Sequence, residues 1–308
     1  MFSGQGSHYH QMGRELFDRN AVFRDSMLRL DGLAKRHIGE SVVDAIYSGT
    51  RDQVFDRTLL THPAIFMVEY SVAQCLLDAG MHPAMTLGAS LGSFAAAVVA
   101  GFLEVEPAMA AVIKQAVAFE ACCERGGMIA ALADPAVFEE PFLADCSELA
   151  GVNFATHFAV SAREQHLAAI EAGLRQRNVT YQRLAVSFAF HSRWIEDAQP
   201  AFEAFIQSVL GSRTEVRGQV PLVCCEHAEA LTALPSDFFW RVVRGPIRLR
   251  ETIARLERGG AHRYIDCGPS GTLATFVKYG LPADSSSTAH SILTPYGRDQ
   301  QALATLLH

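Results

Sequence analysis

The chain has 308 residues, of which 49% are hydrophobic and 19% are charged, so it can bury one large core or one core with a smaller inserted unit. Its formal net charge of −7 argues against nucleic acid as the main partner. No apolar run reaches the roughly 20 residues of a membrane span, and the first residues do not resemble a signal peptide. We therefore expect a cytoplasmic monomer that contacts neither membranes nor nucleic acids.

The first third of the chain alternates strands and helices, which favours an α/β fold. Residues 1–2 end a short strand, a glycine turn follows, and a helix is predicted from about residue 12. Apolar residues at helical spacing predict another helix over 63–79. The segment 83–87 is typical of a strand, and it leads through a turn at 88–92 into an alanine-rich helix.

The middle of the chain has a different order of elements. Strands are predicted at 126–132, 149–155, 157–161 and 180–186, with helices at 134–146 and 163–178. This βαββαβ order is typical of a ferredoxin-like unit. We therefore expect a small ferredoxin-like subdomain at 126–187, inserted into a large α/β-hydrolase-like subdomain with a parallel sheet that comprises 1–125 and 188–308.

The last part of the chain returns to the large subdomain. A helix is predicted from Trp194, followed by a strand at 220–225, helices within 236–258 and a strand at 263–268. The seven cysteines show no Cys-x-x-Cys spacing of the kind that binds metals. We expect free thiols and no metal.

One turn in the sequence predicts a serine nucleophile. Residues 88–92, Gly-Ala-Ser-Leu-Gly, match Gly-x-Ser-x-Gly between a predicted strand and a predicted helix, the context in which a strained serine serves as a nucleophile. The start of a helix also offers free N–H groups to an oxyanion. The nucleophile, Ser90, needs a base. Of the twelve histidines, His191 lies where the chain returns from the small to the large subdomain, and a cleft is expected at such a junction.

Five motifs occur in order along the chain: FSGQGS, LGASLGSFAAAVVAG, GGMIAAL, VSFAFHS and IDCGPSGTLA. Together they resemble the malonyl-CoA:ACP transacylase family, the acyltransferases of polyketide and fatty-acid synthesis. In detail they look most like the free-standing acyltransferase-type proteins of trans-acyltransferase polyketide pathways. The resemblance implies acyl carrier protein domains as partners and no cofactor, because the acyl group arrives on phosphopantetheine or on coenzyme A.

The resemblance also implies roles for individual residues. Ser90 would attack the thioester, and His191 would be the general base of a Ser–His dyad. The backbone N–H groups of Gln5 and Leu91 would form the oxyanion hole. Three further matches lie near the acyl pocket: Asn153, Phe190 at the specificity position, and His62 where the family tends to have glutamine. The bulk of Phe190 would disfavour an α-branched acyl group, and for His62 a neutral, hydrogen-bonded histidine is the simpler interpretation.

Several positions depart from the family pattern, since Ala89, Ser93 and Phe188 replace a usual histidine, a frequent glutamate and a common histidine. The important departure is Gln115. In malonyl-transferring members an arginine lies 25 residues after the nucleophile (115 − 90 = 25) and pairs with the malonyl carboxylate. Because glutamine offers hydrogen bonds without charge, Gln115 predicts a pocket for uncharged acyl groups.

These features predict an acyl-ACP thioester hydrolase that removes groups such as acetyl from carrier proteins through an acyl-serine intermediate. Two alternatives stay open: a trans-acting acyltransferase that loads malonyl or another acyl unit, and a non-catalytic carrier-protein-binding subunit. The acyl chain, the carrier, and whether the chain is free-standing or excised from a larger protein stay open as well. A basic segment that includes Arg241, Arg244 and Arg248 is either a solvated surface or a docking face for an acidic carrier.

Overall fold

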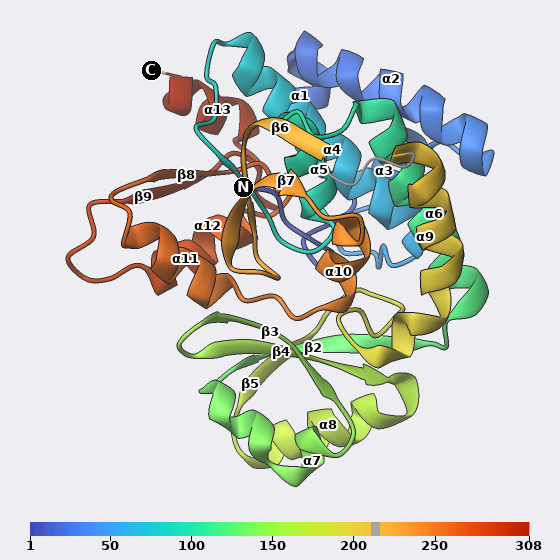
Figure 1. Ribbon diagram of the computed structural model, residues 1–308, viewed down its shortest axis with the longest axis vertical. Coiled ribbons are helices and arrows are strands. Elements are labelled where there is room, and N and C mark those ends of the chain that lie inside the picture. The colour runs from blue at the N-terminus through green and yellow to red at the C-terminus, as the bar shows by residue number, and fades with distance from the viewer. Residues whose placement is uncertain (211–215, 308) are drawn as a thin grey trace.

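The computed structural model describes residues 1–210 and 216–307 and has the α/β fold expected from the sequence (Figure 1). A large body contains most of the helices, and a smaller unit built from the middle of the chain lies below it in this view. Residues 211–215 and 308 of the expected large subdomain lie outside the described part. Within that part, no helix is both long enough and apolar enough to cross a membrane.

The sheet of the large body carries the predicted nucleophile turn at one strand end. Strand β1 (Thr86–Gly88) pairs in parallel with β6 (Val216–Cys224), and β7 (Glu229–Leu234) pairs antiparallel with β6. The expected parallel sheet therefore ends in an antiparallel edge strand. A second parallel pair is formed by β8 (Arg263–Asp266) and β9 (Thr288–Ser291).

The first two residues connect these two groups of strands. The Phe2 N–H donates to the Leu87 carbonyl at 2.8 Å, and the Cys267 N–H donates to the Met1 carbonyl at 3.0 Å. The strand end predicted at residues 1–2 therefore lies between β1 and β8. This placement brings the glycine turn that follows Phe2 beside the turn that follows β1.

Helices surround the strands of the large body. They are α1 (Arg14–Arg19), α2 (Ala21–Ile38), α3 (Val42–Ser48), α4 (Thr58–Asp78), α5 (Gly92–Val99), α6 (Val105–Cys122), α9 (Gln199–Leu210), α10 (Phe238–Arg244), α11 (Leu249–Glu257), α12 (Thr272–Gly280) and α13 (Asp299–Leu307). Helix α4 begins five residues before the predicted start at Pro63. The side chain of Glu120 on α6 accepts the N–H of Leu59 at 2.9 Å and so satisfies a backbone donor of the extra turn.

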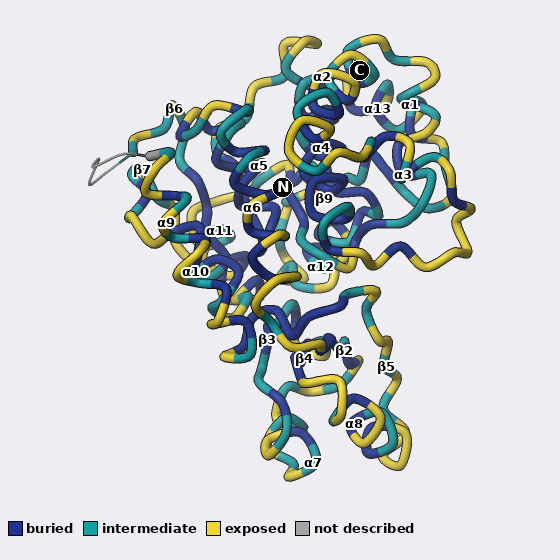
Figure 2. Tube along the Cα trace, turned by 90° about the vertical axis from the view of Figure 1, so that its right-hand side faces the viewer, coloured by how far each residue is buried: buried dark blue, intermediate teal, exposed yellow. Residues whose placement is uncertain are grey.

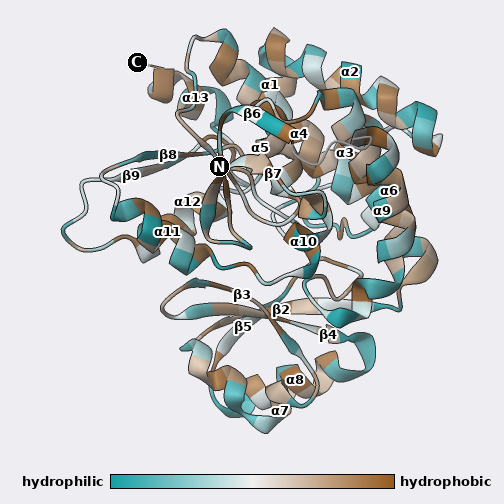
Figure 3. Cartoon of the chain, viewed as in Figure 1, coloured by the Kyte–Doolittle hydropathy of each residue, from teal (hydrophilic) through white to brown (hydrophobic). Residues whose placement is uncertain are grey.

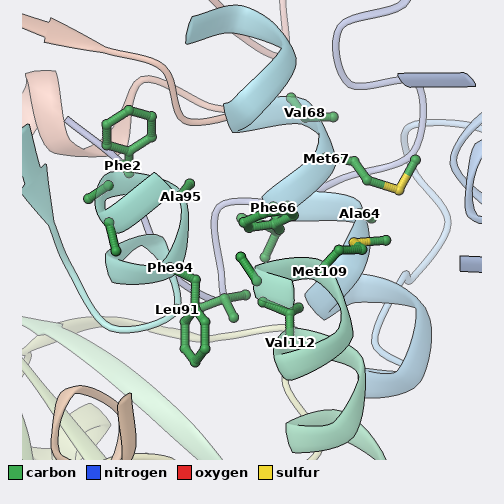
Figure 4. Close-up of a cluster of buried hydrophobic side chains, with 14 of the residues drawn as sticks. Phe2, Ala64, Phe66, Met67, Val68, Leu91, Phe94, Ala95, Met109 and Val112 are labelled. Carbon is green, nitrogen blue, oxygen red and sulfur yellow. The ribbon is translucent and has the colours of Figure 1, made fainter. Parts of the chain in front are cut away.

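The main core lies where α4, α5 and α6 meet. Figure 4 shows Phe66 of α4, Phe94 of α5 and Met109 of α6 converging with Leu91, and all four side chains are buried. Figure 3 shows hydrophobic colouring over much of α4 and α5, whereas α2 at the edge carries hydrophilic stretches. Burial on all sides fixes α5, and with it the turn at its first residue.

The smaller unit is a four-stranded antiparallel sheet with the strand order β3-β4-β2-β5. Its elements are β2 (Gly126–Leu132), a 3₁₀ helix (Pro135–Glu139), α7 (Pro141–Ala144), β3 (Glu148–Phe154), β4 (His157–Arg163), α8 (Glu164–Gln176) and β5 (Thr180–Arg183). This order is the expected ferredoxin-like arrangement. The single helix predicted over 134–146 is wrong, because Pro141 has no N–H with which to continue a helix.

The smaller unit has its own apolar interior between the sheet and its helices, and Figure 2 shows buried residues inside it and exposed ones on the outer helix surfaces. The strand predicted to reach residue 186 stops at Arg183. The helix predicted from Trp194 begins as a 3₁₀ helix (Arg193–Ala198) before α9.

Candidate active site

Ser90 lies in the turn between β1 and α5 with a left-handed backbone, φ 56°. That conformation is uncommon for a residue with a side chain and marks local strain. The flanking glycines make the turn possible. A Cβ on Gly88 would lie 2.4 Å from the Ser93 Cα, and a Cβ on Gly92 would lie 2.2 Å from the Phe2 carbonyl oxygen. The turn therefore packs tightly against the start of its own helix and against the N-terminal strand, with no room for a side chain at either glycine.

His191 meets Ser90 directly. The Ser90 Oγ and the His191 Nε2 lie 2.8 Å apart, and the His191 Nδ1 lies 2.7 Å from the Gly245 carbonyl oxygen. Since a carbonyl only accepts, Nδ1 carries the hydrogen and Nε2 is left to accept the serine hydroxyl. A backbone carbonyl thus holds the histidine tautomer where a triad would use a carboxylate. The structure brings the two predicted catalytic residues together.

The electrostatic state of the dyad follows from burial. Ser90 is 8% exposed and His191 is 3% exposed. Desolvation lowers the pKa of His191 to about 4, while its hydrogen bond to the Gly245 carbonyl opposes the shift and the Arg244 charge adds to it. At neutral pH the imidazole is therefore uncharged and available as a base.

Gln5 and Leu91, the residues predicted to form an oxyanion hole, lie beside the nucleophile turn, because Leu91 follows Ser90 and Gln5 lines the same cavity as Ser90. Gly4 lies so close to the nucleophile that a Cβ on it would be 2.8 Å from the Ser90 Cβ. In the described part of the chain, the backbone N–H groups of Gln5 and Leu91 make no internal hydrogen bond. Two free donors thus flank the serine.

A buried carboxyl group, which sequence reasoning missed, holds the N-terminal turn. The Glu69 Oε1 accepts hydrogen bonds from the Ser3 N–H at 2.5 Å and from the Ser3 hydroxyl at 2.9 Å. Burial raises the pKa of Glu69 well above its usual value, while the two hydrogen bonds from Ser3 oppose the shift. The available signal was a single glutamate inside the otherwise apolar helix α4. Ser3 is thereby fixed immediately before Gly4 and Gln5.

A cavity of about 350 Å³ opens at the dyad. Among the predicted site residues, Gln5, Ser90, Asn153, Phe190 and His191 line it. Much of the remaining lining is apolar, with Met128, Leu184, Ile247, Leu273 and Phe276. Among the described residues that line this cavity, none is a lysine, arginine, aspartate or glutamate.

His62 and Gln115 are not among the residues that line this cavity. The His62 ring packs against Phe190 with centroids 5.4 Å apart, and the Gln5 side chain donates hydrogen bonds to Thr61 and to the His62 Nδ1. Burial lowers the pKa of His62 to about 3, so this ring is neutral. The simpler interpretation of His62, a neutral and hydrogen-bonded histidine, matches these contacts.

Gln115 is fully buried on α6, and neither atom of its amide has a hydrogen-bond partner among the described residues. Phe119, one turn further along the same side of the helix, packs against His62 and Phe190 with centroid distances of 5.9 and 5.2 Å. An unpaired buried amide costs free energy, about 1–3 kcal/mol for each unsatisfied group. The amide therefore favours a partner that the folded chain does not supply.

The three predicted docking arginines already have acidic neighbours. Arg241 pairs with Glu226 at 2.9 Å, Arg244 with Glu196 at 2.7 Å, and Arg248 with Glu251. Their charges are partly neutralised on the surface of the chain itself. The segment is thus less strongly basic than its sequence suggests.

One group of side chains within the described residues combines three ligand types, with Cys224, Glu226 and His227 placing their donor atoms within 4.8 Å of one another. The Glu226 Oε1 already pairs with Arg241 at 2.9 Å, whereas the Glu226 Oε2 and the His227 Nε2, 3.1 Å apart, have no hydrogen-bond partner among the described residues. The arginine charge beside Glu226 opposes a bound cation.

The whole chain, residues 1–308, matches the family model described as "Acyl transferase domain", and the protein belongs to this family. The resemblance predicted from the five motifs is thereby confirmed. Among curated proteins, it is 42% identical over 307 residues to the polyketide biosynthesis acyltransferase homolog BaeD of Bacillus velezensis, covering 98% of this chain and 93% of that protein. It is 41% identical to the polyketide biosynthesis acyltransferase homolog PksD of Bacillus subtilis, covering 99% and 94%.

Solved structures agree in fold. A loading acyltransferase from the avermectin modular polyketide synthase superposes with a TM-score of 0.86 at 23% identity, covering 99% of this chain and 97% of that one. The MCAT of Streptococcus pneumoniae superposes with a TM-score of 0.78 at 25% identity, also covering 99% and 97%. The fold class expected from the sequence is confirmed.

Proposed function

We propose that this protein is an acyl-ACP thioester hydrolase of polyketide biosynthesis that removes uncharged acyl groups, such as acetyl, from carrier proteins through an acyl-Ser90 ester. Family membership and relatives named for polyketide biosynthesis support the enzyme class and the pathway type. The observation that carries the preference for uncharged acyl groups is the cavity at the dyad, whose described lining contains no charged side chain.

The first half of the reaction uses the dyad as found. The Ser90 Oγ attacks the thioester carbonyl carbon while its proton moves to the His191 Nε2, and the Gly245 carbonyl stabilises the resulting imidazolium through Nδ1. The carbonyl oxygen becomes an oxyanion that the N–H groups of Gln5 and Leu91 receive. When the intermediate collapses, the carbon–sulfur bond breaks, and the proton on Nε2 passes to the leaving thiolate.

The second half releases the acyl group. A water molecule attacks the acyl-Ser90 ester and gives a proton to the His191 Nε2, the oxyanion forms again, and collapse breaks the ester bond to Ser90. The proton on Nε2 returns to the Ser90 Oγ, and the free acid leaves. The same steps with a second thiol in place of water would transfer the acyl group, which is the alternative of a trans-acting acyltransferase.

The preference for uncharged acyl groups follows from the cost of burying a carboxylate. Without a cation, a malonyl carboxylate in this cavity would lose several kcal/mol of solvation. One neutral hydrogen bond returns only about 1 kcal/mol. The cavity histidines supply no charge at neutral pH, since burial lowers the pKa of both His157 and His191. The Phe190 ring lines the cavity and restricts its width.

The alternative of a non-catalytic carrier-binding subunit is disfavoured by two costly features. Ser90 keeps a strained backbone at φ 56°, and His191 keeps one at φ 61°. A chain without catalytic function has no reason to retain both at hydrogen-bonding distance.

The decisive experiment incubates the protein separately with acetyl-loaded and malonyl-loaded carrier protein and follows enzyme and carrier by intact mass. We expect rapid loss of acetyl from the carrier and no malonyl-enzyme. Ser90→Ala is the control and should leave both carriers loaded. A stable malonyl adduct on Ser90 would overturn the proposal and favour malonyl transfer.

Gln115→Arg is the companion variant. An arginine here would pair with a carboxylate, so we expect the preference to shift toward malonyl by about tenfold or more, the size of one charge-assisted hydrogen bond. Lys114→Arg, at the exposed neighbouring position of α6, is the matched control. Equal effects of the two variants on acyl preference would show that position 115 does not contact the acyl group.

Docking of the acidic carrier by Arg241, Arg244 and Arg248 remains part of this proposal. Because Glu196 and Glu251 already pair with Arg244 and Arg248, reversing both arginine charges should raise KM for the acyl-carrier substrate by only about two- to fivefold. KM for a small acyl thioester should stay unchanged. If both substrates respond alike, the docking role is wrong.

A further inference from the structure

The catalytic base, His191, lies on a short segment that is held by hydrogen bonds from residues distant in the sequence. His191 has a left-handed backbone, φ 61°, and its N–H donates to the Val243 carbonyl at 3.0 Å. Such a conformation persists in a non-glycine residue only where surrounding contacts hold it. Its own neighbours contribute one further contact, from the Ser192 hydroxyl to the Ala189 carbonyl.

A further anchor comes from the ferredoxin-like unit. The hydroxyl of Ser161, on β4, donates to the carbonyl of Phe190, which forms the peptide bond to His191. Ser161 is fully buried. Residues His157 and Ala159 of the same strand line the active-site cavity, and alternation along a strand places Ser161 on that same face. Ser161 therefore points away from the core of its own unit.

A second contact from this unit holds the segment whose carbonyl accepts the His191 Nδ1 hydrogen. The β3 strand pairs with Ile247, whose N–H donates to the Ala150 carbonyl at 2.8 Å and whose carbonyl accepts the Val152 N–H at 2.9 Å. Ile247 follows Gly245 by two residues, and the Gly245 carbonyl holds the His191 Nδ1. The small unit thus holds both the peptide before His191 and the segment that orients its ring.

We propose that Ser161 is a positioning residue for catalysis, through which the ferredoxin-like unit holds His191 in the orientation that activates Ser90. This inference rests on the proposed Ser90–His191 chemistry. Without the Ser161 hydroxyl, the Phe190 carbonyl loses its donor, and the peptide before His191 is held only through the His191 N–H to Val243. The Nε2–Oγ contact then loosens.

The test uses the full chain and a fluorophosphonate that labels activated serines. We compare Ser161→Ala with Ser147→Ala. Ser147 is the matched control, because it is also buried in the small unit and its hydroxyl also donates to a backbone carbonyl, that of Leu143 at 2.7 Å. Misplacement of a catalytic group by about 1 Å can cost about 100-fold in rate. We expect Ser161→Ala to lower the maximal labelling rate at least about tenfold with an unchanged half-saturating probe concentration, and Ser147→Ala to change neither.

The outcomes separate this inference from the proposed function. Ser90→Ala and His191→Ala must abolish or strongly slow labelling; if they do not, the dyad is wrong and the inference fails with it. If the dyad holds and the two serine variants label alike, only the positioning role is overturned. Should Ser161→Ala fail to fold, Ser161→Cys keeps the size of the side chain with a weaker donor. It should then show a labelling rate between wild type and His191→Ala, and a wild-type rate would overturn the proposal.

Discussion

The turn that carries Ser90 and the segment that carries His191 each place a non-glycine residue at positive φ, 56° and 61°. Around Ser90 the conformation is built locally, by glycines two residues away on either side and by the start of α5. Around His191 it depends on distant partners, the Ser161 hydroxyl and the Val243 and Gly245 backbone. Two strained positions of the candidate dyad can therefore be produced by different means, one by neighbouring residues in the sequence and one by distant contacts.

The turn around Ser90 should tolerate substitution less well than the segment around His191. Gly92→Ala tests this and should give the largest loss of unfolding free energy. A Cβ at position 92 would lie 2.2 Å from the Phe2 carbonyl oxygen, which is backbone and cannot move cheaply. We expect a loss of unfolding free energy of about 4 kcal/mol or more, or no folded protein. Chemical denaturation measures the change.

Gly32→Ala, inside α2, is the control for that variant. A Cβ at this position would meet nothing within 4 Å, so the change should leave the unfolding free energy unchanged or raise it by up to about 1 kcal/mol. A folded Gly92→Ala protein of wild-type stability would contradict the close packing described for the turn.

Burial of the base predicts a pH profile. Because desolvation lowers the pKa of His191 to about 4, the residue is neutral and active throughout the range from pH 5 to 8. The acid limb of kcat/KM for an acyl thioester should therefore have an apparent pKa near 4 rather than near the usual 6.5. Circular dichroism at each pH separates loss of activity from unfolding. An acid limb close to 6.5 would mean that the base is solvated in the free enzyme.

The smallest expected effect is that of His62→Gln on the pH dependence of the free energy of unfolding. The pKa of His62 is lowered to about 3 in the folded chain by burial, with the nearby His8 adding to the shift. The unfolded chain takes up a proton below about pH 6.5 and the folded one does not, so this group lowers stability as the pH falls from about 6.5 toward 3. His62→Gln should remove that dependence, up to about 1.4 kcal/mol per pH unit.

The measurement for His62→Gln is the free energy of unfolding between pH 7 and 4.5. His37→Gln, at an exposed position of α2, controls for the loss of a histidine as such. A variant whose pH dependence equals that of the wild type would place the His62 ring in contact with solvent.

Much of this protein could be predicted from the sequence, because the signals are local. The Gly-x-Ser-x-Gly turn, the βαββαβ order and the departure at Gln115 each occupy a few consecutive residues or one fixed spacing. Local backbone geometry and periodicity determine such features, so α5, the ferredoxin-like unit and the candidate nucleophile were all predictable. Pro141 interrupts the helix predicted over 134–146, and this constraint is visible in the sequence.

Only the tertiary structure decided which groups support the chemistry. Glu69 reaches Ser3 across 66 residues, Ser161 reaches Phe190 across 29, and the Gly245 carbonyl reaches His191 across 54. A backbone carbonyl has no sequence signature, and a buried serine or glutamate shows its role only when its partner is in place. The pairing of Arg244 with Glu196 was hidden for the same reason, because ion pairs depend on distance in space, whereas Arg248 pairs with Glu251 only three residues further along the chain. The sequence by itself determined the strand–turn–helix that carries the candidate nucleophile, because those residues are consecutive; the folded chain determined how the candidate base is held beside it, because its partners are distant in the sequence.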